Sequence, residues 1–432
     1  MKALTLLKRD ISSVQRERII SKFGVRFIIK NNQVFLLRRY GPVTYQILIE
    51  NDPEFFLEMS KAWEKWEHSS LEIPLFPKKE DWEIIRKETQ CIVLSFTAKC
   101  NSNCKICYAK DAFNYTEMSL KKIKKILSLF KNKTILLIGG EPTVRNDFFK
   151  IVKLVKESGN IPAVYTNGLK LANESYVKRM KKEGIVRAHF SFDSFRPEFY
   201  RKIRGDANQL YLKLRALKNL EKYNIEVFLS SVIVPGMNED EAEKLLEFSI
   251  RNNHFIKGLY LWGATPFFGK FDVEMKKILT PSDLIKLLER NNDPINKEYF
   301  IEFKKLRVNL YRIFKKMGKF FPFGDYWGPT LFRVKDGKIE QFISLDELKK
   351  INKMIENKRV FSLTKFLLDK RFYGFPLFKF LRGPLRARYL GKNILTINVG
   401  NILMPHNFLP IKQDSAYIIE INGITAFIAN PG

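Results

Sequence analysis

Three cysteines form the group in this chain that is best suited to chemistry. Cys100, Cys104 and Cys107 have the spacing CxxxCxxC, follow an apolar run at 91–96 and precede a helix-like segment from about residue 119. Because cysteine thiolates are the ligands of iron–sulfur clusters, three of them can hold three irons of a 4Fe-4S cluster. The fourth iron then stays open to another ligand.

Zinc is the main alternative for these thiols. Structural zinc sites take four ligands, often with histidine, whereas the next histidine downstream of the triad is His189. The remaining cysteine, Cys91, lies in the preceding strand-like run, and we expect it to be a buried apolar filler, as free cysteines commonly are. The sequence therefore favours a cluster with three protein ligands over zinc or an electron-transfer ferredoxin.

The triad followed by an aromatic residue, Tyr108, resembles the radical S-adenosylmethionine (radical SAM) superfamily, and the resemblance extends over about residues 89–270. It implies two cofactors, a 4Fe-4S cluster and SAM. The open iron would bind the amino and carboxylate groups of SAM. One electron would then cleave SAM to methionine and a 5′-deoxyadenosyl radical, which abstracts hydrogen from a substrate.

A second motif, Gly139-Gly140-Glu141-Pro142, follows the strand-like run 134–138. Glycines let backbone approach a ligand closely, and a carboxylate can accept hydrogen bonds from an ammonium group. The motif resembles the GGEP motif of the radical SAM family, which binds the amino group of SAM. An ordinary turn after a strand is the alternative.

Further polar residues follow the next strands, and the resemblance implies that they border SAM: Thr166, Asn167, Ser191, Asp193 and Arg204. The alternatives are turn chemistry for Thr166 and Asn167 and a solvated surface position for Arg204. Period two puts Ser191 and Asp193 on one face of a strand. His189 shares that face, and a structural role is favoured over a catalytic one for it.

These residues need a scaffold, and residues 90–270 predict one by alternating strand and helix patterns. The predicted strands are 92–96, 134–138, 163–165, 186–192, 226–234 and 258–262, and the predicted helices are 119–129, 147–158, 174–183, 209–223 and 239–252. The pattern predicts an α/β fold with a parallel sheet. The resemblance implies a partial (β/α)6 radical SAM barrel, with its site at the C-terminal ends of the strands.

The chain divides into three predicted regions. Residues 1–88 form an N-terminal accessory domain, with strands at 24–29 and 33–37 and a helix that Asp52 caps and Pro53 begins. Residues 89–275 form the core barrel. Residues 276–432 form a basic, aromatic α+β region, with a helix after 279–283 and strands at 393–399 and 417–421.

Charge and cysteine content suggest partners and compartment. The 432 residues carry 76 Lys and Arg against 46 Asp and Glu, a net charge of +30, which attracts anionic partners or reflects a lysine-rich proteome. Four cysteines do not make a disulfide scaffold and favour a reducing compartment. With no signal peptide and no apolar stretch of 18 uncharged residues, we expect a cytoplasmic protein, with peripheral association at the inner face of the membrane.

Substrate identity depends on weaker signals. Residues 361–390 interleave aromatic and basic side chains, which suits an anionic membrane surface; a phenylalanine-rich core is the alternative, and single-stranded nucleic acid is the least favoured partner. The motifs at 139–147, 200–205, 234–239 and 266–269 resemble an archaeal branch that includes tetraether-lipid synthases and pterin-precursor methylases.

The interpretation of function is therefore radical modification of a membrane lipid or isoprenoid chain, with ferredoxin or flavodoxin as the electron donor. The alternatives are modification of a peptide or of a small cofactor precursor such as a pterin, or a cluster-binding protein without catalysis.

Overall fold

The computed structural model describes most of the chain with its side chains. The described residues are 18–22, 25–40, 43–64, 91–107, 117–264, 278–316, 330–357, 393–401, 416–421 and 424–429. Tyr108, residues 361–390 and the 266–269 motif, which the sequence singled out, lie outside them.

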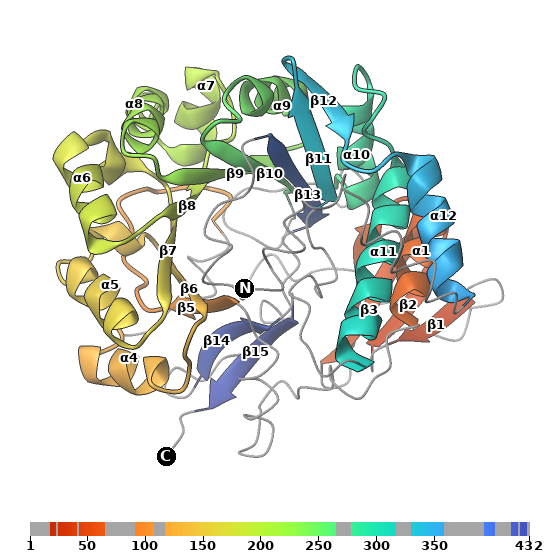
Figure 1. The fold of residues 1–432 in the computed structure, drawn as a ribbon, viewed down its shortest axis with the longest axis horizontal. Helices are drawn as coiled ribbons and strands as arrows, with labels where there is room; N and C mark the ends of the chain where they lie inside the picture. Colours follow the sequence, from red (N-terminus) through yellow and green to blue (C-terminus); the bar gives the residue numbers. More distant parts are fainter. Residues whose placement is uncertain are drawn as a thin grey trace.

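The central feature is a curved sheet of nine strands that stays open (Figure 1). Six parallel strands follow one another in chain order: β5 (Cys91–Ser95), β6 (Thr134–Ile138), β7 (Ile161–Thr166), β8 (Arg187–Ser191), β9 (Glu226–Ile233) and β10 (Ile256–Gly263). These are the six predicted strands, so the α/β prediction and the partial barrel are confirmed.

The C-terminal region extends the same sheet. β13 (Ile394–Asn401) pairs in parallel with β10, and β11 (Thr330–Lys335) and β12 (Lys338–Gln341) continue it in antiparallel fashion. β14 (Ala416–Ile421) and β15 (Ile424–Ala429) form a separate hairpin. The sheet therefore uses strands from both sides of residue 275, and the three domain boundaries stay a prediction.

Helices cover the convex side of the sheet (Figure 1). They are α4 (Leu120–Leu127), α5 (Phe148–Glu157), α6 (Glu174–Glu183), α8 (Gln209–Lys222), α9 (Glu241–Arg251) and α10 (Pro281–Glu289), close to the predicted bounds. Period two in β8 shows how the faces divide: Ala188 and Phe190 are buried in the main core, whereas His189 and Ser191 are partly exposed. The concave face is thus left for polar and aromatic side chains.

The N-terminal region is an antiparallel sheet of β1 (Arg18–Lys22), β2 (Val25–Lys30), β3 (Gln33–Tyr40) and β4 (Val43–Glu50), followed by α1 (Pro53–Glu64). Asp52 caps α1 as predicted, because its carboxylate accepts the N–H of Phe55 at 2.9 Å. Strands β1 and β4 were not predicted.

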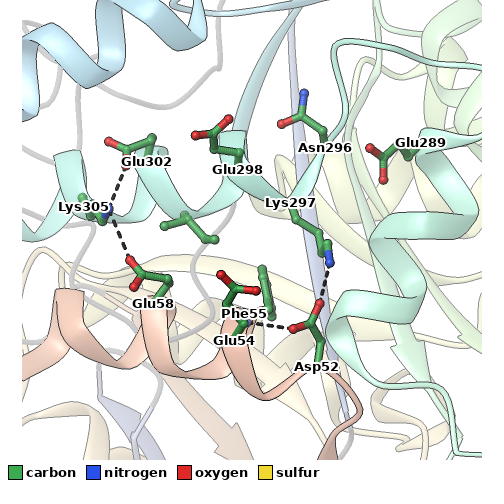
Figure 2. A pocket seen from close by; sticks show the side chains of 11 residues that line it. Asp52, Glu54, Phe55, Glu58, Glu289, Asn296, Lys297, Glu298, Glu302 and Lys305 are labelled. Carbon is green, nitrogen blue, oxygen red and sulfur yellow. Dashed lines mark hydrogen bonds and ion pairs between the residues drawn. The ribbon is translucent and has the colours of Figure 1, made fainter. Parts of the chain in front are cut away.

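α1 lies beside α11 (Lys297–Lys316), which in turn packs against α12 (Leu345–Glu356). Ion pairs join Lys297 to Asp52 and Lys305 to Glu58 across an acidic groove (Figure 2). Phe303, in the basic, aromatic region 276–432, is buried in the main core. Among the described residues, no helix is both long enough and apolar enough for a membrane span.

Candidate active site

A pocket lies at the C-terminal ends of the parallel strands, where the fold was expected to place a site. Its walls come from the cysteine loop after β5, the glycine loop after β6 and the ends of β7 to β10. The lining residues are Cys100, Ser102, Cys104, Ile106, Cys107, Ile138, Gly139, Gly140, Glu141, Tyr165, Thr166, Asn167, Ser191, Arg204, Ser230, Val232 and Trp262.

The two glycines bring the glycine loop against the cysteine loop. The N–H of Gly140 donates to the carbonyl of Thr97 at 2.8 Å, and the N–H of Glu141 donates to that of Lys99 at 2.7 Å. A Cβ at Gly139 would lie 2.1 Å from the Thr97 oxygen, and one at Gly140 would lie 2.5 Å from the carbonyl oxygens of both Ala98 and Lys99. Glycine is required here because backbone approaches backbone, whereas the sequence suggested an approach to ligand.

Glu141 fixes the loop after β7. Its fully buried carboxylate accepts the Thr143 N–H and hydroxyl at 3.1 and 2.5 Å, the Thr166 hydroxyl at 2.8 Å and the Asn167 N–H at 2.6 Å. Burial raises the pKa of Glu141, and these donors oppose the rise. The carboxylate therefore ties Thr166 and Asn167 to the glycine loop, a contact that spacing did not predict.

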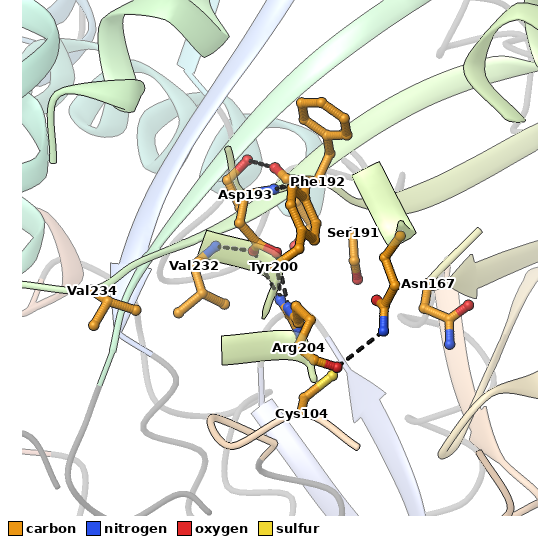
Figure 3. A network of polar contacts seen from close by, with 12 residues as sticks. Cys104, Asn167, Ser191, Phe192, Asp193, Tyr200, Arg204, Val232 and Val234 are labelled. Carbon is orange, nitrogen blue, oxygen red and sulfur yellow. Dashed lines mark hydrogen bonds and ion pairs between the residues drawn. The ribbon is translucent and has the colours of Figure 1, made fainter. Parts of the chain in front are cut away.

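Arg204 is the last residue of a short π-helix (Tyr200–Arg204) between β8 and α8; it lines the pocket and is held by Asp193 (Figure 3). Its Nε and Nη2 donate to the two carboxylate oxygens at 2.9 and 2.8 Å. One of these oxygens also accepts the Val232 N–H at 2.9 Å. Burial opposes the charge on Arg204, but Asp193 and Cys104 raise its pKa above the ordinary value. Arg204 is thus a fixed cation beside a cluster thiol.

The structure separates the predicted site residues into two groups. The three cysteines of the triad, Gly139, Gly140, Glu141, Thr166, Asn167, Ser191 and Arg204 line the one pocket. Asp193 is fully buried behind Arg204, and Pro142 is buried at the start of a short 3-10 helix (Pro142–Val144). Neither belongs to the pocket lining, so a direct role of these two with SAM stays a prediction.

The prediction for Cys91 was wrong, because its side chain is exposed. It begins β5, and the cysteine loop follows the other end of that strand. A five-residue strand rises about 3.3 Å per residue, so Cys91 is far from the triad. It is therefore not placed to act as a fourth ligand.

Lys213 on α8 is a site residue that sequence reasoning missed. It is 1% exposed, and its Nζ donates to the carbonyls of Asn167 at 2.6 Å and Ser191 at 2.7 Å. Burial lowers its pKa to about 8. The available signal was a lysine among the mostly apolar residues of the buried side of α8.

Arg145 was also missed as a support of the cysteine loop. It donates to the Phe96 carbonyl at 2.9 Å while Asp147 holds its guanidinium at 2.6 and 2.9 Å. This arginine belongs to the Thr143–Asp147 stretch that carried the family resemblance. The sequence therefore drew attention to the stretch but did not indicate that Arg145 supports the cysteine loop.

The donor set fits a 4Fe-4S cluster. Three thiols line one pocket, and each ligand of such a cluster binds a separate iron. Among the described residues, no three His, Cys, Asp or Glu side chains gather around a single ion site. Burial raises the pKa of Cys100 to about 11, whereas at Cys104 the effect of burial is overcome by Arg204 and the Ser102 hydroxyl, which bring the pKa below the ordinary value and favour the thiolate. The polar groups of the neighbouring loops fit a zwitterionic ligand such as SAM.

Residues 94–249 match the sequence model of the radical SAM superfamily. The chain is 29% identical to the 7,8-dihydro-6-hydroxymethylpterin dimethyltransferase of Methanocaldococcus jannaschii over 211 residues, 46% of this chain and 41% of that protein. It is 28% identical to a probable GTP 3',8-cyclase of Thermococcus kodakarensis over 197 residues, 43% of this chain and 62% of that protein. The chain thus spans between two fifths and two thirds of these relatives.

Among solved structures, Streptococcus suis SuiB bound to precursor peptide SuiA aligns with a TM-score of 0.39 and 14% identity, over 63% of this chain and 69% of that one. Methylornithine synthase (PylB) aligns with a TM-score of 0.36 and 17% identity, over 54% and 75%.

Proposed function

We propose that this chain, whose residues 94–249 are a radical SAM domain, is an enzyme that cleaves SAM reductively and abstracts hydrogen from a small organic substrate. The observation that carries the proposal is the single pocket in which three thiols meet the Gly139-Gly140-Glu141 loop. When bound, the cluster supplies the electron that splits SAM into methionine and a 5′-deoxyadenosyl radical.

The residues of the chain hold and orient these groups. Cys100, Cys104 and Cys107 bind the cluster, and the backbone bonds from Gly140 and Glu141 fix the loop that carries Cys100. Arg204 presents a cation whose direction Asp193 sets, suited to the carboxylate of SAM. The loop after β7, held by Glu141 and Lys213, closes another wall. These groups are therefore held by contacts within the chain itself, and such preorganisation limits the entropy lost on binding.

The proposal is tested with anaerobically reconstituted protein. We expect about four irons per chain, an EPR signal of the reduced cluster that SAM perturbs, and 5′-deoxyadenosine formation with dithionite. Cys104→Ala should lose all three properties, whereas Cys91→Ala, at the other end of β5, is the matched control and should keep them. An unperturbed EPR signal together with no 5′-deoxyadenosine from wild-type protein would overturn the proposal.

For the substrate, the relatives support a small heterocyclic precursor over a lipid. The two relatives named above are a pterin dimethyltransferase and a probable GTP cyclase. Each name refers to a compound with a bicyclic heterocycle, the pterin ring in one case and the guanine base of GTP in the other. The lipid hypothesis rests on the resemblance to the branch that includes tetraether-lipid synthases and on the basic, aromatic C-terminal region, whose residues 361–390 lie outside the described residues.

Peripheral membrane binding stays a prediction that liposome flotation with anionic archaeal-type lipids at low salt tests. No flotation of the full-length protein would contradict it. Ferredoxin or flavodoxin is proposed as the electron donor, because a cluster-dependent cleavage needs a one-electron reductant. Replacing dithionite by either protein in the 5′-deoxyadenosine assay tests this partner.

A further inference from the structure

Five rings lie along the concave face of β7 to β10, and we call them the aromatic shelf: Tyr165, His189, Phe228, Tyr260 and Trp262. Tyr165, His189 and Phe228 are neighbours in register on three adjacent strands. The His189 ring stacks on Tyr165 at 5.9 Å and on Phe228 at 5.1 Å, with interplanar angles of 15° and 17°. Tyr260 adds a tilted contact to His189 at 5.7 Å.

Glycines in neighbouring strands make room for these rings to lie along the sheet. A Cβ at Gly258 on β10 would lie 2.4 Å from the Phe228 ring, and one at Gly400 on β13 would lie 2.9 Å from the Trp262 ring. Because Gly258 and Gly400 have no side chains, the Phe228 and Trp262 rings can lie over β10 and β13. The result is a row of rings, of which Phe228 is buried and Tyr165, His189, Tyr260 and Trp262 remain partly exposed.

His189 is an unusual residue for simple packing. Burial and the neighbouring Arg187 lower its pKa to about 3, so the ring is neutral and offers one donor and one acceptor nitrogen. Within the described part of the chain, no residue hydrogen-bonds to either nitrogen. Because the His189 side chain is partly exposed, a ligand that lies on the ring can reach these nitrogens and supply the missing bonds.

The shelf is continuous with the proposed cofactor pocket. Tyr165 and Trp262 line that pocket, and the Ser230 hydroxyl, which bonds to the Tyr165 hydroxyl, accepts the Trp262 indole N–H at 3.0 Å. A ligand on the shelf would therefore present an edge to the site where SAM is cleaved. Hydrogen abstraction requires this proximity.

Two arginines that border the shelf are paired with carboxylates. Arg187, which lies over the Phe228 ring at 4.9 Å, is held by Glu226 at 2.8 Å, and Arg204 is held by Asp193. A triphosphate carries several negative charges, and these two arginine–carboxylate pairs leave no net positive charge to offset them. The shelf thus suits an uncharged ring system with amide and amino groups.

We propose that the aromatic shelf binds the substrate, a planar bicyclic heterocycle of pterin type, stacked on the rings and hydrogen-bonded to His189. The proposal rests on the radical SAM function proposed above and names the substrate class of that site.

The test is a fluorescence titration of 6-hydroxymethylpterin with full-length, anaerobically reconstituted protein and SAM. Stacking on aromatic rings should quench the pterin, and GTP should compete at least about tenfold more weakly. His189→Leu should weaken pterin binding about tenfold, the scale of a lost stacking contact and hydrogen bond. His254→Leu makes the same change at an exposed surface histidine and should bind as wild type does.

Iron content and melting temperature show whether His189→Leu folds. If it does not, Phe228→Leu is the second variant, and Phe248→Leu, on the convex side of the sheet, is its control. Absence of quenching, tighter binding of GTP, or equal affinity in the folded His189 and Phe228 variants would each overturn the proposal. The titration needs neither reductant nor turnover. It can therefore fail while SAM cleavage succeeds, or succeed while cleavage fails, so the two proposals are tested separately.

Discussion

Asp193→Asn tests whether the buried ion pair positions Arg204. Asp193 is fully buried, the Arg204 side chain is 13% exposed, and two hydrogen bonds of 2.8 and 2.9 Å join them. Removing one partner of a buried pair costs roughly 3–5 kcal/mol, because the other charge is left uncompensated. Asparagine keeps one acceptor oxygen, so we expect the lower end, a loss of about 3 kcal/mol in the free energy of unfolding.

The double variant Asp193→Asn/Arg204→Met separates this effect from general damage. It removes both charges, and replacing a buried pair by groups of similar size is often close to neutral, so its stability should return to within about 1 kcal/mol of wild type. Glu247→Gln is the matched control, since it breaks the exposed pair with Arg251, whose side chains are 53% and 72% exposed. It should cost less than about 0.5 kcal/mol.

The assay is equilibrium urea unfolding of the reduced, cluster-free chain, followed by circular dichroism at constant pH. Equal m-values across the variants would show that the midpoints report stability. A loss below about 1 kcal/mol in Asp193→Asn, or a double variant no more stable than the single one, would refute the idea that Asp193 compensates a buried charge.

Three further predictions concern other positions. Gly140→Ala should lose most of the bound iron, because its Cβ would lie 2.5 Å from two backbone oxygens of the cysteine loop. The control is Gly236→Ala, whose Cβ would meet no atom within 4 Å. It should keep the iron and lose only about 1 kcal/mol in the free energy of unfolding, because alanine is strained in the left-handed region. Lys213→Met should raise the SAM dissociation constant about tenfold in calorimetry, because two backbone carbonyls lose their hydrogen-bond donor. Unchanged affinity would contradict this. Lys222→Met, at the exposed end of the same helix, is the control. Burial raises the pKa of Glu50 to about 7, so the folded state binds this proton more tightly than the unfolded chain does. The free energy of unfolding should therefore fall by about 3 kcal/mol as the pH rises from about 4.5 to 7. Glu50→Gln should flatten that slope in urea unfolding at several pH values, and a slope equal to that of wild type would contradict the assignment.

The elements of the core could be predicted because their signals are local. Period two along the strands and apolar spacing along the helices depend on residues within one element. The bounds of β6 and α6 were therefore predicted to the residue, and those of the others to within a few residues. Cys91 was wrongly predicted to be buried for a related reason. The alternation along a strand indicates on which face a residue lies, but it does not show whether other elements cover the end of the strand.

The C-terminal region shows where local signals stop. The run at 393–399 was recognised as a strand, yet its place beside β10 in the main sheet depends on pairing with residues more than 130 positions away. α11 was missed because its charged residues interrupt the apolar spacing, although Phe303 and its neighbours are buried. Residues 302–304 and 306–310 of this helix are buried, charged ones included, and such burial is decided by the elements that pack around the helix.

The sequence by itself determined the fold class and indicated the chemistry that we propose, because cysteine spacing, the Gly-Gly-Glu-Pro motif and strand–helix alternation lie within short stretches. Only the tertiary structure decided the roles inside the site. Glu141 binds a loop 25 residues away, Asp193 lies behind Arg204, and Lys213 joins two strand ends. These contacts join residues far apart in the chain, and their hydrogen-bond partners are fixed by packing, which no periodicity of the sequence records.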